Sequence, residues 1–107
     1  MDIERAAEAM GALGAPVRLG IYRRLIRAGE RGMNINQLQR ETTIPRSTLT
    51  HHVHRLIDAG LVSTHKSGSS LICHADYRAM NDLVGYLADE CCLDERSEHN
   101  PQSEGAA

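Results

Sequence analysis

Residues 44–62 read I-P-R-S-T-L-T-H-H-V-H-R-L-I-D-A-G-L-V, a pattern typical of an amphipathic helix. Its apolar residues recur at i, i+4, i+7 and i+8, so they share one face of a helix. They are Leu49, Val53, Leu56 and Ile57, and the opposite face carries Ser47, Thr50, His51, His54 and Asp58. Pro45 favours a helix start and Gly60 a left-handed stop. The stretch therefore predicts a helix over residues 45–59, anchored on one side and presented on the other.

The flanking segments extend this helix into a recognisable unit. Upstream, residues 34–41 have the pattern of a short helix with Asn34 at the N-cap, and residues 42–44 form a brief turn. Downstream, residues 61–66 and 70–73 are short strand-like runs separated by Ser67-Gly68-Ser69, which is turn chemistry for a hairpin. Helix, turn, helix and hairpin in succession predict a mainly α winged helix-turn-helix fold with a small β-hairpin.

The presented helix face carries donors and cations suited to phosphates and base edges. A plain solvated helix has a similar composition, but the flanking helix and hairpin favour a recognition helix. We expect Arg46 and Arg55 to hold the DNA backbone and the wing residues His65 and Lys66 to reach an adjacent phosphate. The candidate DNA-binding residues are Arg46, Ser47, Thr48, Thr50, His51, His54, Arg55, His65 and Lys66. A metal site at His51, His52 and His54 is less favoured than a neighbouring phosphate, and His52, beside Val53, has a structural role as its alternative.

The charges are segregated along the chain, although the formal net charge is only −2. Residues 18–66 hold nine Lys and Arg against three Asp and Glu, a formal charge of +6. Residues 67–107 hold two cations against eight acids, a formal charge of −6. The middle of the chain can therefore approach phosphate while the remainder keeps the molecule soluble. Within that middle segment, Arg23, Arg24 and Arg27 form either a phosphate-contacting patch or, more commonly, a solvated helix face.

A chain of 107 residues with three tyrosines as its only aromatics has a thin core, so a partner subunit would help to bury apolar surface. Residues 2–13 and 76–92 have helical apolar spacing, and Pro16 opens another helix between them. The last helix has Tyr77, Met80, Val84, Leu87 and Cys91 on one stripe. We expect one domain over residues 1–92, followed by an acidic, disordered tail over residues 93–107.

Two motifs resemble the ArsR/SmtB family of metal- and metalloid-responsive bacterial repressors. Residues 12–21, A-L-G-A-P-V-R-L-G-I, resemble the family's opening "ALaxPxRLxIL" signature. Residues 47–53, S-T-L-T-H-H-V, with residues 56–62, L-I-D-A-G-L-V, resemble its "STvSrHLxxLrxAGLV" recognition segment. The resemblance implies a homodimer formed by the first and last helices, which reads inverted-repeat double-stranded DNA.

The cysteines bear on what such a repressor would sense. Residues 34–36 are Asn-Ile-Asn where many arsenic sensors carry Cys-x-Cys, and residues 76–92 lack the histidines of the zinc-sensing site. Cys91-Cys92 resembles a subgroup whose last helix ends in a Cys-Cys pair that responds to trivalent arsenic or antimony, and soft thiolates suit such metalloids. Cys73 or a partner's cysteine would supply a third sulfur, whereas a mono-organic arsenical would need only two.

Two other interpretations of the cysteines stay open. Oxidant, electrophile or reactive sulfur could modify Cys91 or Cys92, with a bridge to Cys73 as one route. Alternatively the cysteines have no sensing role, because free cysteine packs as a small hydrophobe.

Several functional classes are disfavoured by the sequence. It has no recognisable nucleophile, base and orienting-acid pattern, no glycine-rich phosphate loop and no zinc-hydrolase motif, so we expect no enzyme and no required cofactor. No apolar run is long enough to cross a bilayer, and the start does not read as a signal peptide, so we expect a cytoplasmic protein with no membrane partner.

Overall fold

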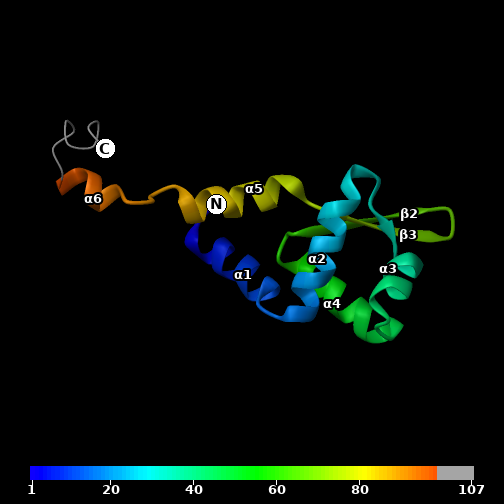
Figure 1. Ribbon diagram of the computed structural model, residues 1–107. Helices are drawn as coiled ribbons and strands as arrows, with labels where there is room; N and C mark the ends of the chain where they lie inside the picture. The colour runs from blue at the N-terminus through cyan, green and yellow to red at the C-terminus, as the bar shows by residue number, and fades with distance from the viewer. Residues whose placement is uncertain (99–107) are drawn as a thin grey trace.

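The computed structural model describes residues 1–98, with side chains described as far as residue 95. In chain order the elements are α1 (Ile3–Leu13), α2 (Pro16–Ala28), the 3-10 turn η1 (Gly29–Arg31), β1 (Met33–Asn34), α3 (Ile35–Thr42), α4 (Arg46–Asp58), β2 (Val62–Ser67), β3 (Ser70–Ala75), α5 (Tyr77–Ala88) and α6 (Leu93–Glu98) (Figure 1). None of the helices in this part of the chain is both long and apolar enough to span a membrane.

Local sequence signals account for the starts of α1, α2 and α3. Asp2 caps α1 by accepting the amide of Arg5 at 2.8 Å, and Asn34 caps α3 by accepting the amides of Asn36 and Gln37. These carboxylate and amide oxygens satisfy helical N–H groups that have no partner within the helix. Pro16 occupies the first position of α2, where its missing N–H costs nothing. Pro45 lies one residue before α4, at the N-cap and not inside the helix as predicted.

The core lies where α2, α3 and α4 meet one face of the sheet. Its largest fully buried side chains are mainly leucines, and they are Ile21, Leu25, Leu38, Leu49, Leu56, Leu61 and Cys73. As the sequence predicts, α4 buries Leu49, Val53 and Leu56 and exposes its other face. Each such aliphatic side chain contributes about 1.5–3 kcal/mol on burial, so this packing fixes the orientation of α4.

The wing is a three-stranded antiparallel sheet in the order β1-β3-β2. The predicted hairpin is confirmed, although β3 continues to Ala75, two residues beyond the expected end. The third strand, β1, was not predicted because its two residues are too few to show alternation. Gly32 brings the chain onto β3: its φ is +66°, and a Cβ there would clash with the Cys73 carbonyl oxygen and lie 2.8 Å from the His74 ring.

Two tyrosines lie near the junction of α2 and α5 and differ in their hydrogen bonding. The Tyr77 hydroxyl donates to the Ile26 carbonyl at 2.8 Å and lies 3.4 Å from the Leu25 carbonyl, so it ties the start of α5 to the end of α2. The Tyr22 hydroxyl is buried with no hydrogen-bond partner within the described residues. Burial first, and the nearby Asp76 carboxylate second, raise the pKa of Tyr22 to about 12.

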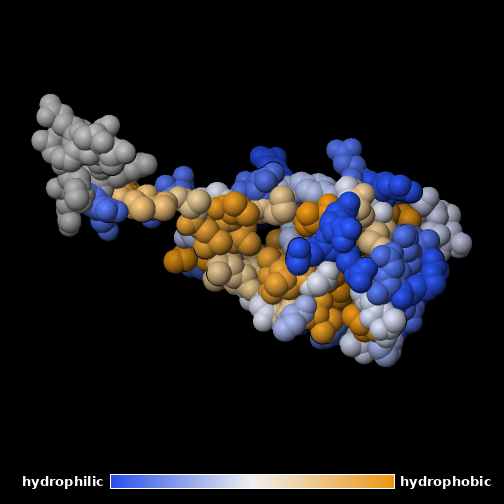
Figure 2. Space-filling model, viewed as in Figure 1, coloured by the Kyte–Doolittle hydropathy of each residue, from blue (hydrophilic) through white to orange (hydrophobic). Residues whose placement is uncertain are grey.

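The apolar residues of α1 divide between two faces. Alanines pack inward, at positions 6, 9 and 12, and let the helix approach α2 and α4 closely. Ile3 and Met10 of the same helix are instead 69% and 48% exposed. On α5 only Leu83 is buried, while Val84 and Leu87 are each 59% exposed. A hydrophobic surface therefore covers the outer sides of α1 and α5 (Figure 2).

The C-terminal region differs from the sequence-based expectation. The last long helix ends at Ala88, so Cys91 and Cys92 lie in the turn that follows it and do not end the helix. Residues 93–98, expected to begin a disordered tail, form the short helix α6. This helix lies beyond the end of α5, away from the wing (Figure 1). The rest of the predicted tail, residues 99–107, lies outside the described residues.

Candidate DNA-binding surface and cysteine pair

The structure exposes the polar face of α4 as the sequence predicts. Six of the nine candidate DNA-binding residues project from this helix as exposed side chains, and they are Arg46, Ser47, Thr48, Thr50, His51 and His54. Arg55, near the C-terminal end of α4, is half-buried. These groups offer hydroxyl, imidazole and guanidinium contacts along a rigid element, which is the geometry required for insertion into a major groove.

Arg46 has a structural role that the sequence did not reveal. Its Nε donates to Gln39 Oε1 at 2.8 Å, and its Nη2 donates to Asn36 Oδ1. Both acceptors belong to α3, so the side chain ties the first turn of α4 to the preceding helix. A guanidinium has five N–H donors, and three of them remain for a phosphate. Arg46 can therefore orient α4 and contact the DNA backbone at the same time.

His52 is set apart from the other histidines of α4. It is half-buried, and its Nδ1 is buried without a hydrogen-bond partner among the described residues. Desolvation is the largest cause that lowers the pKa of His52, followed by the charges of Arg18 and His51. These features agree with the structural alternative that the sequence left open. Among the described residues, no group of three or more His, Cys, Asp or Glu could hold a metal ion.

The wing brings His65 together with His74, a residue that sequence reasoning missed. The two rings stack at 4.8 Å between centroids, with His65 Nδ1 and His74 Nε2 3.1 Å apart. His65 is opposite Ile72 in the β2–β3 register, so His74 is its diagonal neighbour on the same face. The predicted hairpin could have revealed this pair, but its second strand was predicted to end at Cys73, one residue before His74. Lys66 is exposed beside this pair.

Cys91 and Cys92 form an exposed pair of sulfurs. Their Sγ atoms lie 3.4 Å apart, a separation that allows an S–H···S contact and exceeds the about 2.05 Å of a disulfide. The backbone of Cys92 has a φ of +61°, in the left-handed region that non-glycine residues seldom adopt. Both side chains are exposed, so reagents in solution can reach them.

Cys73 lies apart from this pair. It occupies the middle of β3, is fully buried in the core, and has a pKa raised to about 11 by that burial. The twelve residues of α5, about 18 Å of helix, separate its strand from the turn that holds the other cysteines. The structure therefore does not bring the three predicted sulfurs together, and Cys73 is a thiol of the core.

Comparison with known proteins supports the interpretation of the fold. A family model described as a helix-turn-helix domain matches residues 13–65. The structure resembles the crystal structure of an ArsR family transcriptional regulator, with a TM-score of 0.74, 25% identity, and coverage of 89% of this chain and 95% of that chain. A possible transcriptional regulator for arsenical resistance gives a TM-score of 0.66 at 25% identity, with coverage of 85% and 91%.

A third solved structure is the homodimeric winged helix-turn-helix DNA-binding domain of a possible ArsR-family regulator from Mycobacterium bovis. It has a TM-score of 0.64 and 20% identity, with coverage of 83% of this chain and 82% of that chain. No curated protein gives a significant match.

The fold, together with a recognition helix whose polar face is exposed, defines a winged helix-turn-helix DNA-binding protein. It carries a helix-turn-helix domain over residues 13–65, and its fold is similar to that of ArsR family transcriptional regulators.

Proposed function

We propose that the protein is a homodimeric repressor that leaves its operator when an inducer bonds to Cys91 and Cys92. The observation that carries this proposal is the pair of exposed sulfurs 3.4 Å apart, directly after α5, a helix in which Leu83 alone is buried. The sensing site would then directly follow the helix that makes the subunit contact. The favoured inducers are trivalent arsenic or antimony species.

The geometry of the sulfur pair suits one bridging metalloid atom. An atom bonded to both sulfurs at about 2.3 Å, with an angle of about 95°, needs sulfurs roughly 3.4 Å apart. Trivalent arsenic prefers a pyramidal set of three ligands. Because Cys73 is buried and distant, a mono-organic arsenical, whose carbon is the third ligand, fits this pair best. Inorganic arsenite or antimonite would keep a hydroxide or take a sulfur from a partner subunit.

The dimer rests on the hydrophobic surface of α1 and α5. Ile3, Met10, Val84 and Leu87 are between 48% and 69% exposed in the single chain. Exposed apolar surface of this extent typically marks an interaction site. The Mycobacterium bovis relative is a homodimer, and a twofold dimer would present two copies of α4 to successive major grooves of an inverted repeat. A bond at the sulfur pair would shift this seam and misalign the two recognition helices.

A thiol switch is the second candidate, because the same sulfurs are adjacent and exposed. Peroxide would oxidise one thiolate to a sulfenic acid, and the neighbouring thiol would displace water to form a Cys91–Cys92 disulfide. Closing that bond requires the sulfurs to approach from 3.4 Å to about 2.05 Å in a strained eight-membered ring. Such a disulfide would be readily reduced, so release would be reversible.

Release from promoter DNA separates these candidates. Reduced protein on fluorescent operator DNA is titrated with phenylarsine oxide, arsenite, zinc, peroxide and a persulfide donor, and anisotropy is followed. We expect release by the arsenical, retained in Cys73→Ala and lost in Cys91→Ser/Cys92→Ser, while both variants bind DNA as tightly as wild type. Release only by peroxide or persulfide, reversed by reductant, would establish the thiol switch instead. Equal release of the double serine variant would refute both.

The role of the α4 face is tested without inducer. His51→Ala should weaken operator binding about tenfold, the loss of one or two polar contacts, without lowering the melting temperature. His52→Gln is the matched control on the half-buried side of the same helix. If His51→Ala binds the operator as tightly as wild type at moderate salt, the His51 side chain does not contact the DNA.

A further inference from the structure

A hollow of about 390 Å³ opens between α2, η1 and α3, away from the sulfur pair. Arginines from α2 and η1 form one side, two polar residues of α3 form the other, and a buried methionine contributes to the lining. The residues used below are Arg24, Arg27, Arg31, Met33, Gln37 and Glu41. A volume in the range of about 300–1,000 Å³ is typical of small-molecule sites.

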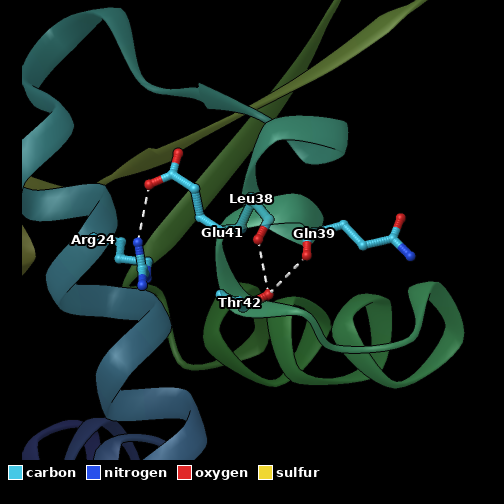
Figure 3. A network of polar contacts seen from close by, with 5 residues as sticks. All are labelled: Arg24, Leu38, Gln39, Glu41 and Thr42. Atoms are coloured by element: carbon cyan, nitrogen blue, oxygen red, sulfur yellow. Dashed lines mark hydrogen bonds and ion pairs between the residues drawn. The ribbon is translucent and has the colours of Figure 1, made fainter.

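The arginines converge because of their spacing. Arg24, Arg27 and Arg31 follow at intervals of three and four, so they share one face of α2 and its continuation into η1. Arg24 Nη1 pairs with Glu41 Oε1 at 2.9 Å across the gap between α2 and α3 (Figure 3). Within residues 1–95, Arg27 and Arg31 make no ion pair. The hollow therefore has three guanidinium groups and one carboxylate.

We propose that this hollow binds a small anion bearing a phosphate group. Arg27 and Arg31 would be its main ligands, because guanidinium forks match phosphate oxygens in pairs. Gln37 offers an amide donor from the opposite side, and Glu41 competes with the anion for Arg24. Backbone phosphates of DNA carry the same chemistry and are the other possible source, although a concave site suits a compact ligand better.

Occupation of the hollow would reach the recognition helix through α3. Gln37 and Glu41 line the hollow, while Asn36 and Gln39 of the same helix hold Arg46 at the start of α4. An anion that joins α2 to α3 therefore contacts the element that orients α4. This inference uses no cysteine and stands independently of the inducer proposed above.

The test is isothermal titration calorimetry of the full chain with inorganic pyrophosphate at low ionic strength. The variants are Arg27→Ala/Arg31→Ala, Glu41→Gln, and the control Arg23→Ala/Arg40→Ala, which removes two exposed arginines outside the hollow. We expect the first to weaken pyrophosphate binding about tenfold or more, the control to stay within about twofold, and Glu41→Gln to bind several-fold tighter. Melting curves verify that each variant is folded.

A second titration with nonspecific duplex DNA identifies the source of the phosphate. If pyrophosphate binds and its binding depends on Arg27 and Arg31, the ligand of the hollow is a free anion. If pyrophosphate does not bind, but duplex affinity falls in Arg27→Ala/Arg31→Ala and not in the control, the hollow holds backbone phosphate. If the two double variants behave alike toward both probes, the proposal is wrong, whatever the operator and inducer experiments show.

Discussion

Removing the hydroxyl of Tyr77 should destabilise the protein, whereas removing that of Tyr22 should not. Tyr77→Phe deletes the 2.8 Å bond to the Ile26 carbonyl and leaves the last turn of α2 without that donor. A neutral hydrogen bond contributes about 0.5–1.5 kcal/mol. We therefore expect a loss of about 1 kcal/mol, or a melting temperature lower by about 4–8 °C for a domain of this size.

Tyr22→Phe is the matched control, since it makes the same chemical change at a hydroxyl with no described partner. Its removal ends the cost of burying an unpaired polar group, so stability should stay equal or rise by up to about 1 kcal/mol. Urea unfolding at one protein concentration measures both variants, which also holds any subunit association fixed. A loss in Tyr22→Phe as large as that in Tyr77→Phe would refute the hydrogen-bond argument.

The Tyr22→Phe control also predicts a difference in stability at alkaline pH. Its pKa is raised to about 12 in the folded state, against an ordinary value of about 10. The unfolded chain therefore loses this proton first, and stability falls as the pH rises from about 10 towards 12. That fall should be shallower in Tyr22→Phe than in Tyr77→Phe, which retains the buried phenol.

Three further predictions follow from individual side chains. Native protein should react with Ellman's reagent at two thiols per chain, with the third appearing only in denaturant, because Cys73 is buried with a raised pKa; rapid reaction of all three would contradict its place in the core. Because the pKa of His52 is lowered, the unfolded chain takes up its proton first, so stability should fall as the pH drops below about 6.5; His52→Gln should flatten this fall in urea titrations. Gly32→Ala should lower the free energy of unfolding by at least about 2 kcal/mol, because of its positive φ and the clash with β3. Gly68→Ala, whose φ of +64° lies in an open turn, should lower it less. Equal losses in the two variants would show that the chain near residue 32 can shift away from β3 to avoid the clash.

Local sequence patterns predicted the helices and strands of this fold better than they predicted which elements pack against each other. The spacing of Leu49, Val53 and Leu56 identified both faces of α4, because burial on a helix follows a period of 3.6 residues. The short strand β1 exists through pairing with Cys73 and Ile72, which lie far along the chain. No local pattern could reveal that pairing.

The sequence predicted which residues of α4 are exposed, but not how their side chains are arranged. The exposed residues of α4 were identified correctly. The hydrogen bonds from Arg46 to Asn36 and Gln39 of α3, however, depend on side-chain conformations that sequence spacing does not determine. The apolar repeat of the last helix appeared to continue through Cys91, yet the helix ends at Ala88. That difference moves the two cysteines off the apolar stripe and into a turn.

The shallow attachment of α5 would tie folding to protein abundance in a dimer. Within its own subunit this helix has Tyr77 as its anchor and Leu83 as its buried contact. If a second copy covers the remaining apolar side chains, each newly made chain completes its structure only when it meets another. The folded fraction then rises with the concentration of the regulator, and a scarce regulator would be exposed to proteolysis before it could occupy DNA. The cell would thus set the amount of DNA-binding regulator through its rate of synthesis.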